Sequence, residues 1–350
     1  MKEIFFIGSY AKAEETGVYA AEFDNETGEV RLLGSYAGLQ NPTFLSVDAV
    51  DRRLYAIAEL PGPDGGKRGA LAAFAIDESH GLSLLNIEGT VPAPTCHVEL
   101  DRTRRWLLTS SYHGGMVGVT PVYEEGEVGP ASDIQRHEGS SVLPVQDRPR
   151  AHSATIDRNN RFAVVCDLGA DRIVTYRLDD ASGKLTYASS VAAAPGAGPR
   201  HFAFHPSRML GYAINELNST VAVYAYDEMS GELSEIQTVA TLPDDFRGDN
   251  ACADIHVSPD GKFLYGSNRG HDSIVVYRID VDGRLSWVEH ASVLGAHPRN
   301  FALTPDGSYV LAANRDTNDV VVFRRNAATG KLRPTGHRLN VSKPVCIKFL

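Results

Sequence analysis

The chain has 350 residues, of which 43% are hydrophobic and 22% charged, a composition typical of a globular protein with a large core, which excludes disordered and fibrous classes. Its formal net charge of −10 repels nucleic acid and anionic membranes, so we expect neither as a partner. The N-terminal apolar run covers only residues 4–7, too short for a signal peptide or a membrane span, and we expect a cytoplasmic protein.

The predicted elements repeat along the chain. The first is a strand in EIFFIGSY (residues 3–10). A pair of strands then recurs at residues 41–59, 93–112, 149–168, 198–216, 252–269 and 297–315, and KPVCIKFL (343–350) holds only the first strand of a seventh copy. A third alternating strand and a glycine turn follow each pair. The turn glycines Gly28 and Gly330 lie 302 residues and six repeats apart, which gives about 50 residues per repeat.

Units of this length, with four short strands and no convincing amphipathic helix, predict a β-propeller. We expect a single all-β domain over residues 1–350: a seven-bladed propeller with four-stranded blades, in which the N-terminal strands pair with the C-terminal strand and close the ring. Two β-sandwich domains would not explain why the C-terminus supplies a first strand that the N-terminus completes.

No residue pattern predicts a metal ion or another cofactor. His201 and His205 would lie roughly 13 Å apart on a strand, too far for chelation. The cysteines are widely spaced and form no CxxC pair, which argues against disulfide and zinc frameworks. They are Cys96, Cys166, Cys252 and Cys346.

Aligned repeats identify two sets of equivalent positions, one at the start of the first strand and one 16 residues later at the end of the second. Because the two strands form an antiparallel hairpin, both positions lie at the same mouth of the central channel. The first set is Thr43, Cys96, His152, Arg200, Ala253, Arg299 and Val345. The second set is Glu59, Tyr112, Leu168, Glu216, Arg269, Arg315 and Tyr10.

These positions bring four arginines, one histidine and two glutamates together, a local excess of two positive charges when the histidine is neutral. Such an excess on a chain of net charge −10 favours an anionic ligand, and the planar guanidinium suits phosphate or carboxylate. The alternative is that the charges only pair with one another across a hydrated channel.

Four blocks carry a family resemblance: AHSATIDRNNR (151–161), GAGPRHFAFHPS (196–207), INELNSTVAVY (214–224) and ADIHVSPDGKFLYGSNR (253–269). Their sequence and spacing resemble the lactonase family of seven-bladed propellers, which includes bacterial 6-phosphogluconolactonases and fungal carboxy-cis,cis-muconate cyclases. The resemblance covers nearly the whole chain. It implies hydrolysis of a small anionic sugar lactone, most closely 6-phosphogluconolactone to 6-phosphogluconate.

The functional residues of that family, a histidine, an arginine, a glutamate and a second arginine, correspond to His152, Arg200, Glu216 and Arg269. We expect His152 or Glu216 to act as the general base that takes a proton from water. Arg200 and Arg269 would hold the developing oxyanion or the phosphate. Position alone suggests that further residues support substrate binding. They are Arg299, Arg315, Tyr10, Tyr112 and Asp254.

Three alternatives stay open on the sequence. One is muconate-type chemistry on another carboxylated lactone, which the same arginine-rich mouth would serve. A second is a calcium-dependent gluconolactonase-type propeller with Glu59, Asn215 and Asn268 as ligands, although the nearby arginines would repel the cation. The third is a non-catalytic interaction scaffold.

Overall fold

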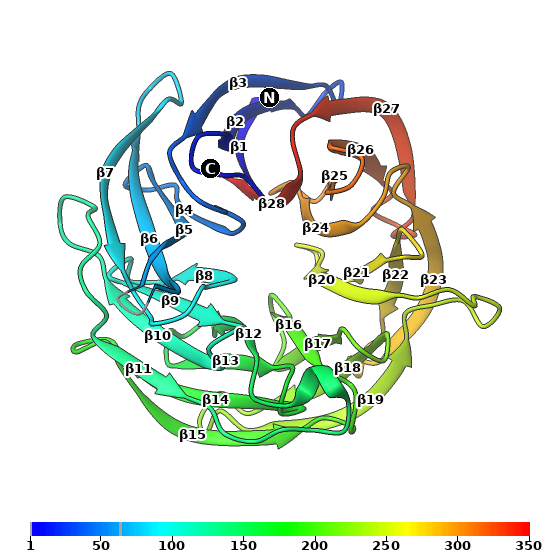
Figure 1. The fold of residues 1–350 in the computed structure, drawn as a ribbon. Coiled ribbons are helices and arrows are strands. Elements are labelled where there is room, and N and C mark those ends of the chain that lie inside the picture. Colours follow the sequence, from blue (N-terminus) through cyan, green and yellow to red (C-terminus); the bar gives the residue numbers. More distant parts are fainter. Residues whose placement is uncertain (1, 63–64) are drawn as a thin grey trace.

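The computed structural model describes residues 2–62 and 65–350, and its strands form a ring of seven four-stranded antiparallel sheets (Figure 1). The predicted seven-bladed propeller is therefore confirmed. In each blade the first strand lies next to the central axis and the fourth lies at the rim.

We number the blades from the first that is continuous in sequence. Blade 1 contains β4 (Leu45–Asp48), β5 (Arg53–Pro61), β6 (Lys67–Ile76) and β7 (Leu82–Gly89). Blade 2 contains β8 (His97–Leu100), β9 (Trp106–Ser111), β10 (Met116–Pro121) and β11 (Asp133–Arg136). Blade 3 contains β12 (Ala151–Ile156), β13 (Phe162–Asp167), β14 (Arg172–Asp179) and β15 (Lys184–Ala192). A 3-10 turn over Pro144–Gln146 precedes blade 3.

The remaining blades follow the same order. Blade 4 contains β16 (Pro199–Phe204), β17 (Leu210–Asn215), β18 (Thr220–Tyr226) and β19 (Leu233–Ala240). Blade 5 contains β20 (Ala251–Val257), β21 (Phe263–Arg269), β22 (Ser273–Ile279) and β23 (Leu285–Ser292). Blade 6 contains β24 (Pro298–Leu303), β25 (Tyr309–Asn314), β26 (Asp319–Arg325) and β27 (Leu332–Asn340). Blade 7 contains β28 (Pro344–Phe349), β1 (Lys2–Ser9), β2 (Thr16–Asp24) and β3 (Val30–Ala37).

Blade 7 closes the ring because its strands come from both ends of the chain (Figure 1). β28 pairs with β1 in the antiparallel register that sets Phe5 opposite Phe349. The centres of the two phenyl rings lie 5.6 Å apart. The closure predicted from the split repeat is confirmed. It buries apolar faces that a blade would expose if it stood alone.

The repeated turn glycines pack against the neighbouring blade. Gly183 and Gly330 have positive φ angles of 64° and 76°, which favour glycine. A Cβ atom added to Gly183 would lie 2.2 Å from the Trp106 ring, and one added to Gly330 would lie 2.3 Å from the Phe263 ring. The glycine marker in the sequence therefore serves contact between blades as well as the turn.

A β-bulge interrupts the first strand of several blades where it reaches the channel mouth. In β12, β16 and β24 the pairing with the second strand skips one residue, and the skipped residues are His152, Arg200 and Arg299. A bulged residue is unpaired in the ladder and its strand bends locally, so that its side chain can be redirected. Three of the ionisable residues of the mouth thus lie at bulge positions.

Candidate active site

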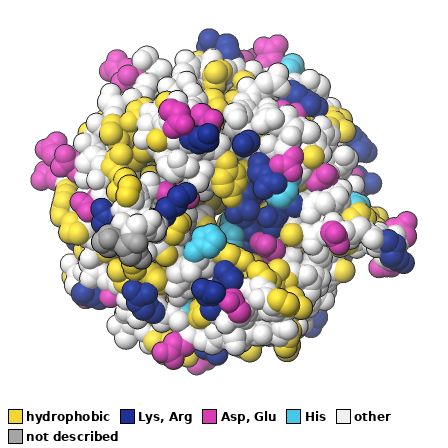
Figure 2. All heavy atoms as spheres, viewed as in Figure 1, with side chains coloured by type: hydrophobic (Ala, Val, Ile, Leu, Met, Phe, Trp, Pro, Cys, Tyr) yellow, Lys and Arg dark blue, Asp and Glu magenta, His cyan; other side chains and the backbone are white. Residues whose placement is uncertain are grey.

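The channel mouth contains a cavity of about 260 Å³. It is lined by Tyr10, Asn41, Thr43, Glu59, Pro94, Thr95, Cys96, Tyr112, His113, His152, Glu216 and Arg299. Eight of these belong to the two sets of equivalent positions, so residues from both sets do meet at one opening. Figure 2 shows basic and histidine side chains gathered around the central hollow of this face.

Glu216 lies between two buried arginines. Its Oε2 atom is 2.8 Å from Nε of Arg200 and 2.9 Å from Nη2 of Arg269. The guanidinium groups are held in turn by backbone carbonyls: Arg200 Nη1 donates to Ala253 O at 2.6 Å, and Arg269 Nη2 donates to Cys252 O at 2.7 Å. The carboxylate and both arginines therefore form one rigid unit below the cavity.

The electrostatics of this unit keep Glu216 ionised. Burial raises the pKa of the carboxyl, but the opposing charges of Arg269, Arg200 and Arg299 outweigh it and leave the pKa below its usual value. Burial, followed by repulsion from Arg299 and Arg269, lowers the pKa of Arg200 to about 9. A carboxylate tied to two guanidiniums is a weak proton acceptor, which makes Glu216 the poorer candidate for the general base.

His152 is buried at the cavity wall, with 4% of its surface exposed. Its ring lies 5.7 Å from that of Tyr112 and 5.3 Å from that of His201, both edge-on. Its Nδ1 atom lies 3.9 Å from the sulfur of Cys96. Burial and then the positive charge of Arg200 hold the pKa of His152 well below its usual value, so the imidazole is neutral at pH 7.

Arg299 is the cation of the cavity that has no counter-ion. Its guanidinium lies 5.8 Å from the centre of the Tyr10 ring, and no carboxylate of the described chain is within ion-pair distance of it. Pairing within the channel therefore accounts for Arg200 and Arg269 but not for Arg299. An uncompensated guanidinium in a partly desolvated cavity attracts an anion.

Asp254 does not line the cavity but lies one layer below it. Its Oδ1 is 2.8 Å from His201 Nδ1, and its Oδ2 is 2.9 Å from His256 Nε2 and 2.5 Å from Asn300 Nδ2. The other nitrogen of His201 is 3.1 Å from Arg200 Nη1. Because a guanidinium can only donate, His201 Nε2 accepts, and the ring proton on Nδ1 is donated to Asp254.

Sequence reasoning considered His201 only as a metal ligand and missed this connection to Arg200. The comparison of equivalent positions could have indicated this contact. His201 directly follows Arg200, Asp254 directly follows Ala253, and Arg200 and Ala253 are equivalent positions in neighbouring blades. His205 does not belong to this network, because its Nε2 atom instead lies 3.0 Å from Gly261 O. The described residues contain no group of three or more His, Cys, Asp or Glu side chains that could hold a metal ion.

Two of the three ligands of the calcium alternative, Glu59 and Asn268, are engaged elsewhere, whereas the Oδ1 atom of Asn215 is buried without a hydrogen-bond partner. Glu59 is 2.6 Å from Lys67 Nζ and accepts a hydrogen bond from Asn41. The Asn268 amide bonds to Thr241 through both its oxygen and its nitrogen. This arrangement does not form a converging set of oxygen ligands of the kind that calcium requires.

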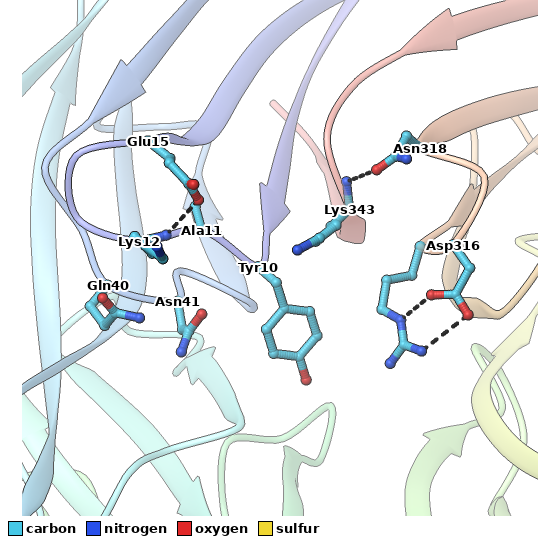
Figure 3. A pocket seen from close by; sticks show the side chains of 10 residues that line it. Tyr10, Ala11, Lys12, Glu15, Gln40, Asn41, Asp316, Asn318 and Lys343 are labelled. Atoms are coloured by element: carbon cyan, nitrogen blue, oxygen red, sulfur yellow. Dashed lines mark hydrogen bonds and ion pairs between the residues drawn. The ribbon is translucent and has the colours of Figure 1, made fainter.

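Arg315 lies outside the central cavity and is paired with Asp316 at 2.6 Å. It lines a second cavity of about 700 Å³, which shares Tyr10 and Asn41 with the first (Figure 3). The sequence-predicted residues therefore divide into those of the central cavity, those bonded below it, and Arg315 beside it.

The buried histidines predict how stability changes with pH. Burial lowers the pKa of His201 to about 4, and burial also holds the pKa values of His97 and His152 below the usual value. An unfolded chain binds a proton at each site below pH ~6.5, whereas the folded chain does not. The free energy of unfolding should therefore fall as the pH drops from 6.5 to 5, which urea titrations at several pH values would measure. His201→Gln should have a shallower slope, and a flat wild-type profile over this range would contradict the assignment.

The fold and the cationic cavity at its axis define a β-propeller whose channel mouth suits small anionic ligands. The chain belongs to the family described as "Lactonase, 7-bladed beta-propeller", which matches residues 4–349.

Among its relatives, a 6-phosphogluconolactonase of Bacillus subtilis (strain 168) is 38% identical over 354 residues, covering 100% of this chain and 99% of that one. A 6-phosphogluconolactonase of Formosa agariphila is 35% identical over 349 residues, covering 96% of both. The solved structure of a periplasmic gluconolactonase of Pseudomonas aeruginosa superposes with a TM-score of 0.92 at 30% identity, covering 100% of this chain and 99% of that one.

A search of the described residues for a helix of sufficient length and apolarity to span a membrane finds none. The cytoplasmic location stays a prediction from the sequence.

Proposed function

We propose that this protein hydrolyses a sugar lactone, with 6-phosphogluconolactone as substrate and 6-phosphogluconate as product. The observation that carries the proposal is the cavity itself, which combines the neutral imidazole of His152 with the uncompensated guanidinium of Arg299. Relatives named 6-phosphogluconolactonase over nearly the full chain length support the choice of substrate.

In the proposed mechanism, water attacks the C1 carbonyl carbon of the lactone while His152 Nε2 takes a proton from it. The carbonyl electron pair moves onto oxygen, and the guanidinium of Arg299 stabilises the resulting oxyanion together with the positive charges of Arg200 and Arg269, which lie below the cavity. When the bond between C1 and the ring oxygen breaks, the imidazolium returns its proton to that oxygen and the open-chain acid leaves. The low pKa of His152 is compatible with this role, because the oxyanion formed in the same step offsets the cost of its positive charge.

The remaining charged residues act as supports in this proposal. Glu216 holds Arg200 and Arg269 in place, and Asp254 orients Arg200 through His201. Tyr10 and Tyr112 form walls of the cavity. We assign no metal ion or organic cofactor to the reaction.

The test is the rate at which 6-phosphogluconolactone opens at neutral pH with and without the protein, in the presence and absence of a chelator. Formation of 6-phosphogluconate can be followed with a dehydrogenase that oxidises it. We expect acceleration well above the spontaneous rate, unchanged by the chelator. Absence of acceleration by folded protein would contradict the proposal and direct attention to other carboxylated lactones.

A further inference from the structure

The second cavity lies beside the central one, where blades 6, 7 and 1 meet (Figure 3). Its walls come from the loops that follow β1 and β25 and from those that precede β4 and β28. Tyr10 and Asn41 line both cavities, so the two spaces adjoin. The central cavity, at about 260 Å³, is smaller than the usual ~300–1,000 Å³ of a small-molecule site, which leaves room there for only part of a larger ligand.

Two lysines supply the free positive charge of this second cavity. Arg315 is neutralised by Asp316, and Glu15 accepts a hydrogen bond from the backbone nitrogen of Lys12 at 3.0 Å. No carboxylate of the described chain lies within ion-pair distance of the ammonium group of Lys12 or Lys343. Both ammonium groups are therefore available to a ligand.

The backbone of Lys343 is held firmly although its side chain is free. Its nitrogen donates to Asn318 Oδ1 at 2.9 Å, and its carbonyl accepts from Tyr10 N at 3.2 Å. Its φ angle of 42° lies in the left-handed region that favours glycine. The equivalent position, directly before a proline, also has a positive φ in blades 1, 4 and 6, where it holds Asn41, Gly198 and His297. The chain thus places a long cationic side chain at the cavity where a glycine would be less strained.

We propose that the second cavity binds the phosphate group of a phosphorylated sugar lactone through Lys12 and Lys343 while the lactone ring occupies the central cavity. The inference rests on the proposed function and extends it by assigning the residues that distinguish phosphorylated from unphosphorylated lactones. Lysine ammonium groups bind phosphate as compact point charges, and two that lack counter-ions suit its double negative charge. Tyr10, which lines both cavities, lies at the junction that the bound molecule must pass.

The test compares kcat/KM for 6-phosphogluconolactone and for glucono-1,5-lactone, which has the same ring without the phosphate. The variants are Lys343→Gly, which also relieves the backbone strain, Lys12→Ala, and the two combined. The ratio of the two kcat/KM values should fall by about 10- to 100-fold in the combined variant, mainly through KM for the phosphorylated lactone. Lys331→Ala, an exposed lysine at the far end of blade 6, should leave the ratio unchanged.

A binding measurement separates this inference from the proposed function. Calorimetry with 6-phosphogluconate and with gluconate needs no turnover. Wild-type protein should bind the phosphorylated acid more tightly, and the combined variant should lose that difference. Equal binding of the two acids by wild type, or a ratio that does not respond to the variants, would overturn the phosphate site. Absence of turnover together with preferential binding of the phosphorylated acid would overturn only the proposed reaction.

Discussion

Replacing His152 with alanine should lower kcat/KM for the lactone by about 10²- to 10⁴-fold, the usual contribution of a general base. The structure supports the expectation because His152 is a buried, neutral imidazole in the cavity wall, whereas the Glu216 carboxylate is bound by two arginines. His337→Ala, on the outer strand β27, serves as the matched control and should retain full activity.

Added imidazole separates a base from a merely structural residue. The alanine variant leaves a space beside Tyr112 and Cys96 that a small base can enter. Partial recovery of the rate with imidazole would support proton transfer. Activity of His152→Ala near that of wild type would remove His152 from the mechanism.

The same assignment sets the pH dependence of the wild-type enzyme. A base works only when it is unprotonated, so activity is present above the folded-state pKa and is lost as the pH falls through it. Because the pKa of His152 is held well below the usual ~6.5, kcat/KM should stay level from neutral pH to well below 6.5 before it declines.

Glu216→Gln should destabilise the fold by about 3–5 kcal/mol, the range observed when one partner of a buried ion pair is removed. The substitution leaves Arg200, with 2% of its surface exposed, and Arg269, with 8%, without their shared carboxylate. The loss would appear as a lower midpoint in urea denaturation. Activity should fall as well, because the position of Arg200 depends on that carboxylate.

Glu59→Gln is the matched control for stability, since Glu59 occupies the equivalent ring position of blade 1. Its partner Lys67 is mostly exposed, so removal of that ion pair should cost less than about 1 kcal/mol. Equal losses in the two variants would show that the channel does not desolvate the Glu216 cluster as the structure indicates.

The repeat in the sequence by itself determines most of the fold. Seven copies of one pattern define strand order, the turn glycines and the split blade, because each repeat uses the same local pairing rules. The ring positions followed from the hairpin geometry, since the start of one strand and the end of the next must lie at one edge of a sheet. That argument was enough to bring His152, Glu216 and Arg299 to one opening.

The tertiary structure decided which of these residues pair, which are free and which lie deeper. The bulges that set apart His152, Arg200 and Arg299 depend on how first strands pack around the axis, and an alternating pattern contains no sign of them. Likewise, sequence alone could not show that Asp254 lies below the cavity.

Distances between blades also explain why the sequence left the base unresolved between His152 and Glu216. Repeat spacing places both residues at the mouth, but their pKa values depend on burial and on the arginines that neighbouring blades bring near. Arg200 comes from the same blade as Glu216, whereas Arg269 and Arg299 come from the next two blades, and only packing around the channel determines how close these side chains lie.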